Sequence, residues 1–395
     1  MASSDTKQTR EKIPVTPDLL VWARKTAGMN LSEVAQKMGK DVSIIKSWEM
    51  GDANPTYIQL EKLAYQIYKR PLALFFFPEP PEEETPRQSF RTLPDKEIEF
   101  MSSRMHYLLK KARSMQVNLA ELNDFTNPAK KNIIRDLKFQ SSTPVDIIAD
   151  RVRDYLGIDL DQQFRWSGEV EALNSWRNRL QEYGVYIFKE SFKDDTYSGF
   201  CLYDDDFPLI YLNNSTSKNR QIFSIFHELA HLLFGTGGVD AEDDTYIGDL
   251  EGENKRIEII CNKFSGAFLV PDKDFSPRIA QTSLSDNAIM NLSKMYKVSR
   301  EVILRKYLDK GLIKSSYYSR KVAQWTKELR KYKKSGGGNF YATQGTYLGE
   351  GYMSLAFTRF YQNRISENQL ADYLGVKVKN ISGMESLIFE KGGLP

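Results

Sequence analysis

The chain has 395 residues, of which 41% are hydrophobic, and a formal net charge of +3. A chain of this length is too long for one hydrophobic core of ordinary size, so two to four domains are expected. The small positive net charge permits nucleic-acid contact without arguing for it. The polar N-terminus predicts no signal peptide, and no apolar run is long enough to cross a membrane. The only two cysteines, Cys201 and Cys261, lie far apart, which favours a reduced, cytoplasmic protein.

Residues 14–77 are predicted to form a series of short helices. Two amphipathic segments, 31–39 and 42–51, are joined by a tight turn at a glycine, as in a helix-turn-helix. The expected packing positions are Ala35, Met38, Val42, Ile45 and Trp48. This pattern and the segment 48–56 resemble the Xre/Cro-type helix-turn-helix family, which implies DNA binding by a domain at 1–77.

The expected recognition helix departs from the pattern of that family. Asp41 and Val42 stand where the family usually carries serine followed by glutamine or arginine. An aspartate repels phosphate and a valine can touch only a thymine methyl group, so Lys40, Ser43 and Lys46 remain as candidate DNA contacts. The alternative is a helix-turn-helix that serves protein contacts or homodimer formation.

Residues 78–143 are predicted to link this domain to the rest of the chain. The segment 78–86 is rich in proline and glutamate and predicts a stiff boundary. A long amphipathic helix is expected at 97–122. It carries His106, whose predicted role is structural.

Residues 144–334 are predicted to form a separate domain with helices and a small antiparallel sheet. Helices are expected at 144–156 and 170–183. The expected strands are 185–188, 198–203 and 207–213, the last two joined by a turn of three aspartates. The segment 209–213 is predicted to be an edge strand that could bind an extended peptide by strand addition.

The strongest motif is His227-Glu228-Leu229-Ala230-His231, inside an apolar run that ends at Gly235. On a helix, residues four apart share a face, so His227 and His231 can bind one metal ion together. Glu228 lies beside them and could take a proton from an attacking water. This is the HExxH pattern of zinc proteases.

A catalytic zinc site needs a third protein ligand, and the only other histidine is His106. A carboxylate on the helix expected at 250–269 is therefore predicted. Glu258 stands among apolar residues, where an unpaired carboxylate would be costly. Glu251, Glu253 and the acidic segment 240–244 are alternatives, although the contiguous charges of 240–244 favour a solvated loop. Asn262, one turn after Glu258, could orient a ligand.

The HExxH motif, the segment from Glu258 to Asn262 and the sequence Leu269-Val270-Pro271 together resemble the ImmA/IrrE family of minimal gluzincin peptidases. The resemblance covers residues 145–320. It implies a zinc peptidase whose third ligand, the glutamate of an E-x-x-A-N segment, falls on Glu258. Cys261 replaces the usual alanine of that segment. Tyr203, Tyr211 and Tyr246 are candidates for stabilising the oxyanion, and the sequence does not choose among them.

The last segment, 335–395, is predicted to be a helical domain that follows a glycine-rich hinge at 336–338. Its residues 371–385 repeat the spacing of apolar and small residues at 35–49, which predicts a second helix-turn-helix-like motif. Lys377, Lys379 and Asn380 lie at its expected turn. The alternative is the same fold used for docking.

The sequence thus predicts a multidomain, mostly helical protein with a small sheet, an α+β gluzincin-like peptidase flanked by helix-turn-helix domains. By resemblance, its predicted function is a Zn²⁺-dependent regulator that cleaves a specific protein substrate, such as a transcriptional repressor, in a stress or mobile-element response. The alternative is a non-enzymatic, antitoxin-like DNA-binding regulator whose zinc site is structural or idle. A structural site has no use for Glu228, which favours the enzyme.

Overall fold

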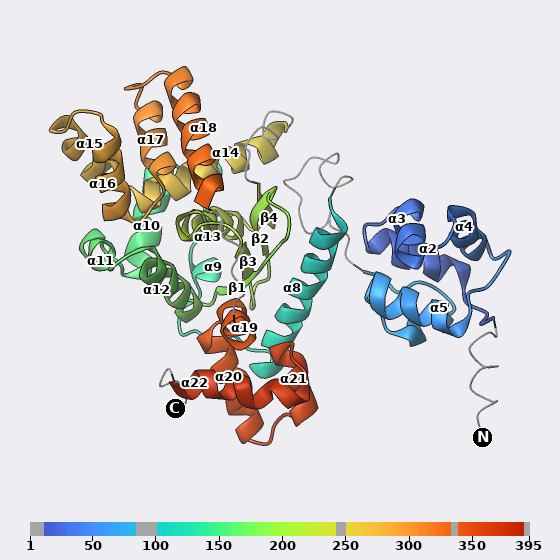
Figure 1. Cartoon of the computed structure of the whole chain (residues 1–395). Coiled ribbons are helices and arrows are strands. Elements are labelled where there is room, and N and C mark those ends of the chain that lie inside the picture. The colour runs from blue at the N-terminus through green and yellow to red at the C-terminus, as the bar shows by residue number, and fades with distance from the viewer. Residues whose placement is uncertain (1–11, 84–100, 242–249, 333–338, 391–395) are drawn as a thin grey trace. The chain divides into compact units, whose positions relative to one another are not determined.

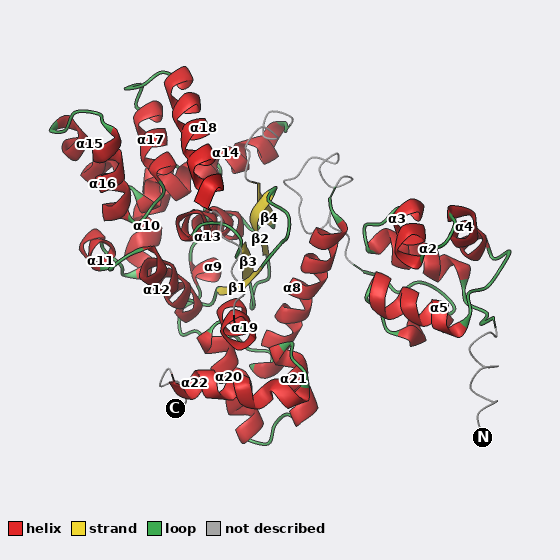
Figure 2. Cartoon of the chain, viewed as in Figure 1, coloured by secondary structure: helices red, strands yellow, loops and turns green. Residues whose placement is uncertain are grey.

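The computed structural model describes residues 12–83, 101–241, 250–332 and 339–390. The chain divides into two compact units, one of Met1–Gln88 with Asp95–Lys111 and one of Ser89–Pro94 with Ala112–Pro395. Figures 1 and 2 show many helices and, in the described residues, a single small sheet. This confirms the predicted mostly helical α+β class. No helix among the described residues is both long and apolar enough to cross a membrane.

The first unit is helical. Helix α3 begins at a capping box between Asn30 and Glu33 and ends at Gly39, whose φ of 67° suits a residue without a side chain. Helix α4 begins three residues later, at Val42, with Asp41 as its N-cap. The helices of this unit before residue 84 are α2 (Pro17–Thr26), α3 (Leu31–Met38), α4 (Val42–Met50), α5 (Tyr57–Glu61), a π-helix (Lys62–Tyr68) and a 3-10 helix (Leu72–Phe76).

Ala35, Met38, Ile45 and Trp48 are buried where α3 and α4 meet, so these predicted packing positions are confirmed. Val42 is 38% exposed instead. It lies at the first position of α4, on the side away from the core. The structure thus supports the helix-turn-helix, but it places Val42, which was expected in the core, at the surface.

The second unit contains a mixed four-stranded sheet in the order β1-β3-β2-β4. Its strands are β1 (Tyr186–Glu190), β2 (Tyr197–Leu202), β3 (Leu209–Asn213) and β4 (Gly238–Ala241). The expected antiparallel pairing holds for β2 with β3 and for β2 with β4, but β1 and β3 are parallel. The prediction that 209–213 is an edge strand is wrong, because β1 and β4 pair on either side of the β3-β2 hairpin.

Helices surround this sheet, and α13 lies directly against it while α14 and α12 pack on α13 (Figure 1). The core between them is aromatic: the ring of Trp176 makes edge contacts with Trp166, Phe226 and Phe268 at centroid distances of 5.0–5.3 Å. The helices up to residue 332 are α8 (Ser103–Leu122, shared between the two units), α9 (Ile133–Asp136), α10 (Val145–Leu156), α11 (Leu160–Arg165), α12 (Glu169–Glu182), α13 (Lys218–Leu233), α14 (Gly252–Leu269), α15 (Asp272–Ala280), α16 (Asp286–Tyr296), α17 (Arg300–Asp309) and α18 (Ser315–Tyr332).

The expected hinge at 336–338 lies outside the described residues, and the helices that follow it belong to the same compact unit. They are α19 (Phe340–Leu348), α20 (Glu350–Tyr361), α21 (Glu367–Leu374), a 3-10 turn (Val378–Asn380) and α22 (Ile381–Glu390). As in the first unit, α21 begins at a capping box and ends at a glycine, Gly375, with φ of 62°. This arrangement supports the predicted second helix-turn-helix-like motif.

The surroundings of the two motifs differ. In the second, a Cβ at Gly383 of α22 would lie only 2.3 Å from the ring of Tyr341 on α19. The corresponding position of α4 is Ser47, on a helix whose outer face is exposed. Helix α19 therefore covers part of the second helix of the C-terminal motif.

Arg177 joins the C-terminal helices to the sheet. Its buried guanidinium donates hydrogen bonds to the carbonyl oxygens of Ile187 in β1 and of Thr346 and Tyr347 in the last turn of α19. Burial lowers the pKa of Arg177 to about 10, so the group stays charged at neutral pH. The carbonyls at a helix C-terminus favour a cation, which explains how a buried arginine is tolerated here.

We predict that Arg177→Met lowers the free energy of unfolding by about 3 kcal/mol, because the buried carbonyl group of Ile187 and the part-buried ones of Thr346 and Tyr347 lose a charged donor. Arg179→Met, on the same helix, is the control: it removes a partly exposed ion pair with Glu182 and a contact with the ring of Tyr183, and should cost less than about 1 kcal/mol. Denaturant titration of both variants measures the difference. Equal effects would contradict the role given to Arg177.

Candidate metal centre

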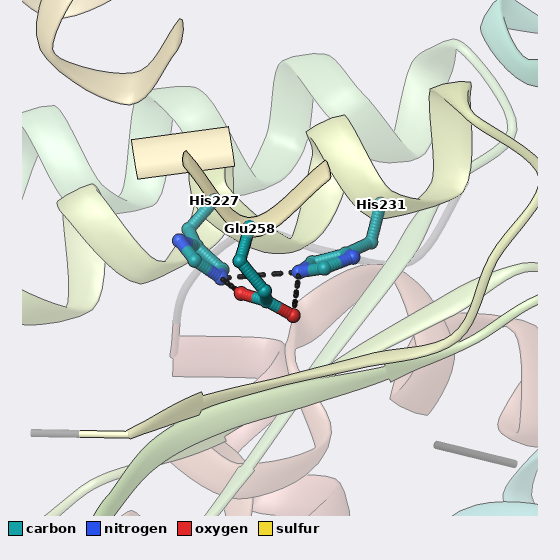
Figure 3. A group of neighbouring side chains, drawn as sticks. All are labelled: His227, His231 and Glu258. Atoms are coloured by element: carbon teal, nitrogen blue, oxygen red, sulfur yellow. Dashed lines mark hydrogen bonds and ion pairs between the residues drawn. The ribbon is translucent and has the colours of Figure 1, made fainter. Parts of the chain in front are cut away.

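Two packed helices bring the predicted site residues together. Helix α13 is N-capped by Ser217 and carries His227, Glu228 and His231, and α14 carries Glu258. All four side chains are at most 1% exposed. Figure 3 shows the two imidazole rings and the carboxylate of Glu258 converging on one point.

The spacing of the three donor groups suits a small divalent cation. The Nε2 atoms of His227 and His231 lie 3.1 Å apart, and the carboxylate oxygens of Glu258 lie 3.5 Å and 3.4 Å from them. Ligands at zinc bond lengths on a tetrahedron would be about 3.3 Å apart. The three residues could therefore hold a metal ion. A tetrahedral ion bound by one donor atom from each would have one further position for water or substrate.

The electrostatics of the site also favour a cation. Burial acts to lower the pKa of His227, but the negative charges of Asp240 and Glu258 raise it to about 10. Burial acts to raise the pKa of Glu258, and the two histidines hold it below its usual range instead. The acidic groups thus draw positive charge to the imidazoles, and a bound metal would displace protons from them.

Asn262 lies where the sequence predicts it. Its Oδ1 is 3.1 Å from Nδ1 of His227, so it can accept a hydrogen bond from Nδ1–H, which leaves Nε2 unprotonated and free to bind metal. A residue that the sequence did not single out faces the other histidine: the hydroxyl of Thr236 lies 3.4 Å from Nδ1 of His231 and donates to the carbonyl oxygen of that residue.

Glu228 is fully buried beside the two histidines. No N–H or O–H group in the described part of the chain donates to either of its carboxylate oxygens, and the thiol of Cys201 is a weak partner. Burial raises the pKa of Glu228 to about 7, against the opposing effect of His227 and His231. A carboxyl group with a pKa near neutrality is suited to both accepting and returning a proton.

The other candidates for the third ligand lie elsewhere. Glu251 and Glu253 are exposed at the start of α14. The expectation of a solvated loop is wrong for Asp240, which is 1% exposed in β4 and accepts hydrogen bonds from Arg220 and Ser224 of α13. Residues 242–249 lie outside the described chain.

This contact with Asp240 reveals functional structure that sequence reasoning missed. The short strand β4 begins at the second of two consecutive glycines and contains only four residues, so no periodic pattern marks it. Asp240 ties it to Ser224 and Arg220 of α13, which lie about one and two turns before His227. A buried aspartate next to an HExxH helix could have been noticed only by asking which partner compensates its charge.

The three tyrosines considered for stabilising the oxyanion differ in where they lie and in what their hydroxyl groups contact. The hydroxyl of Tyr211 donates to Glu190 inside the sheet, and that of Tyr203 donates to Asp205 in the hairpin turn. Tyr246 lies outside the described residues. His106 belongs to the first unit, where it packs against Gly28 and burial lowers its pKa to about 4, which agrees with the predicted structural role.

The candidate DNA contacts lie on the surface of the first unit. Lys40, Ser43 and Lys46 are all exposed around the start of α4. The carboxylate of Asp41 caps this helix and accepts hydrogen bonds from the backbone N–H and the hydroxyl of Ser43. The aspartate that looks unfavourable for DNA binding thus has a local structural reason.

Comparison with known proteins agrees with this geometry. Residues 180–307 match the family model of the IrrE N-terminal-like domain, Peptidase_M78, and residues 20–64 match a helix-turn-helix model. A solved structure of a Mycobacterium tuberculosis transcriptional regulator is similar at 20% identity over 40% of this chain and 44% of that one, with a TM-score of 0.27. This chain therefore spans less than half of that protein. No curated protein matches.

The two family matches indicate the class of the protein. Residues 20–64 are similar to helix-turn-helix domains, and residues 180–307 are similar to the IrrE N-terminal-like domain of a peptidase family. The resemblances stated from the motifs are thereby confirmed for both segments.

We predict that Asn262→Ala lowers the affinity for zinc about 10- to 100-fold, because His227 loses the partner that fixes its tautomer. Lys263→Ala, at the next and exposed position of α14, is the control and should bind zinc as the wild type does. Competition with a chromogenic chelator gives both affinities. Equal affinities would show that Asn262 does not support the ligand.

Proposed function

We propose that this chain is a zinc-dependent endopeptidase that regulates a cytoplasmic stress or mobile-element response by cleaving a specific partner protein, such as a repressor. The observation that carries the proposal is the buried set of His227, His231 and Glu258 at tetrahedral spacing, with Glu228 beside it. Three ligands and one free carboxylate are what a hydrolytic zinc site requires.

His227, His231 and Glu258 would hold the zinc ion. When bound, zinc acts as a Lewis acid that polarises a peptide carbonyl group and makes an attacking water more acidic. Glu228 takes the proton of that water and passes it to the leaving amine. Burial of Glu228 serves this role, since its raised pKa lets the carboxyl group exchange a proton near neutral pH.

Strand β4 is the part of the sheet that supports peptide binding. Among the strands that the structure describes, it pairs with β2 alone, and it passes directly over His231. An extended peptide that adds to its open edge would run next to the metal centre. The strand has only four residues, so such pairing gives few hydrogen bonds, which favours a substrate that also makes contacts elsewhere.

We predict that Glu228→Gln keeps the fold and full zinc content but abolishes cleavage, because the amide cannot accept the proton. Since the substrate is unknown, the measurement is a census of new protein N-termini in host cells that produce either form. His231→Ala, which should lose zinc as well as cleavage, separates ligand from base. If the new N-termini persist with Glu228→Gln, the peptidase proposal fails, and the alternative of an antitoxin-like, non-enzymatic regulator remains.

The DNA-binding part of the proposal rests on the first unit. Residues 12–77 contain nine Lys or Arg against six Asp or Glu, whereas residues 339–390 contain four against five. The start of α4 is exposed, while α22 is partly covered by α19. We therefore assign DNA contact to Lys40, Ser43 and Lys46, with a homodimer reading two half-sites, and docking within the chain to the C-terminal motif.

We predict that Lys40→Glu with Lys46→Glu weakens DNA binding by the full chain at least about tenfold at low salt, and that the salt slope of binding falls by about two. Lys377→Glu with Lys379→Glu, at the equivalent turn of the C-terminal motif, is the matched control and should have no effect. Fluorescence anisotropy with DNA from upstream of its own gene measures both. A reversed outcome would move the DNA contact to the C-terminal motif.

A further inference from the structure

The backbone of β4 touches the face of one proposed metal ligand. A Cβ atom placed on Gly238 would lie 2.3 Å from Cδ2 and 2.4 Å from Cγ of His231, well inside contact distance. The backbone of Gly238 is not in the left-handed region, so its conformation does not call for glycine. What requires glycine at this position is the space taken by the imidazole ring.

Gly238 cannot easily move away from the ring. It pairs with Cys201 in the antiparallel ladder between β2 and β4, and two residues later Asp240 ties the same strand to Arg220 and Ser224 of α13. The strand is thus held to β2 at the contact and to α13 two residues after it. The ring of His231 is fixed in turn, since it lies between this strand and the other ligands.

The two histidines are oriented by different means. His227 has a side-chain amide, that of Asn262, at 3.1 Å from its Nδ1. His231 has only the Thr236 hydroxyl at 3.4 Å, which is a long and weak hydrogen bond. Something besides hydrogen bonding must therefore hold the Nε2 of His231 at 3.4 Å from the carboxylate of Glu258. The flat contact with Gly238 meets this need.

We propose that Gly238 is a positioning residue of the metal centre, and that its missing side chain lets β4 press His231 into the orientation that binds metal. This inference rests on the proposed function, because it takes His231 to be a ligand. A methyl group at position 238 would either turn the ring away from Glu258 or lift the strand from β2. Both movements displace Nε2 from the ligand position.

The test is Gly238→Ala in the full chain. We expect the affinity for zinc to fall about 10- to 100-fold, as when other supports of a ligand are removed. With Co²⁺ in place of zinc, the absorption bands of the site should shift or change in intensity per bound ion, whereas partial unfolding would lower only the number of ions bound. Gly266→Ala, on α14, is the matched control: nothing lies within 4 Å of its Cβ, so affinity and spectrum should be unchanged.

A second comparison keeps the proposal testable if Gly238→Ala folds poorly. In a His231→Ala background the ring is gone, so adding Gly238→Ala should not lower the melting temperature or the residual metal binding further. An equal loss in both backgrounds would overturn the proposal. So would zinc affinity within about twofold of the wild type and an unchanged Co²⁺ spectrum for Gly238→Ala. Absence of zinc binding by the wild-type chain would instead overturn the metal site itself and this role with it.

Discussion

The structure depends on the cost of burying ionisable groups between two packed helices. His227, Glu228, His231 and Glu258 are all but inaccessible, and they lie within an apolar core built from α10, α12, α13 and α14. Charged groups in such a place destabilise a fold unless they are compensated. Two imidazoles facing one carboxylate compensate each other in part, and a divalent cation would complete the compensation. The stability and the chemistry of this region therefore rest on the same contact.

The sheet contributes to the centre through its shortest strand. Strand β4 is held against α13 by Asp240 and lies flat on His231 at Gly238. The strand proposed to receive an extended peptide is thus in contact with a proposed metal ligand. If both proposals hold, substrate binding and ligand geometry share this one strand.

The helix-turn-helix pattern occurs twice, and its surroundings decide what each copy can do. Both copies have a capping box, a left-handed glycine and the same buried positions. In the first, the start of α4 is exposed and the domain is basic. In the second, α19 covers α22 and is itself fastened to β1 through Arg177. The local sequence determines that the motif forms, and tertiary packing determines whether its outer face is exposed or covered.

The sequence by itself determined the helices, the two resembling families and the convergence of His227 with His231, because helical periodicity and spacing are local properties. It also predicted Glu258 as a ligand, since a carboxylate among apolar residues needs a partner, and Asn262 as its neighbour one turn further along the same helix. Only the tertiary structure decided that β1 runs parallel to β3, that β4 and not 209–213 lies at the edge, and that Asp240 is buried. These features depend on pairing between segments far apart in the chain. Such pairing is selected by the packing of the whole unit, and no short stretch of sequence encodes it.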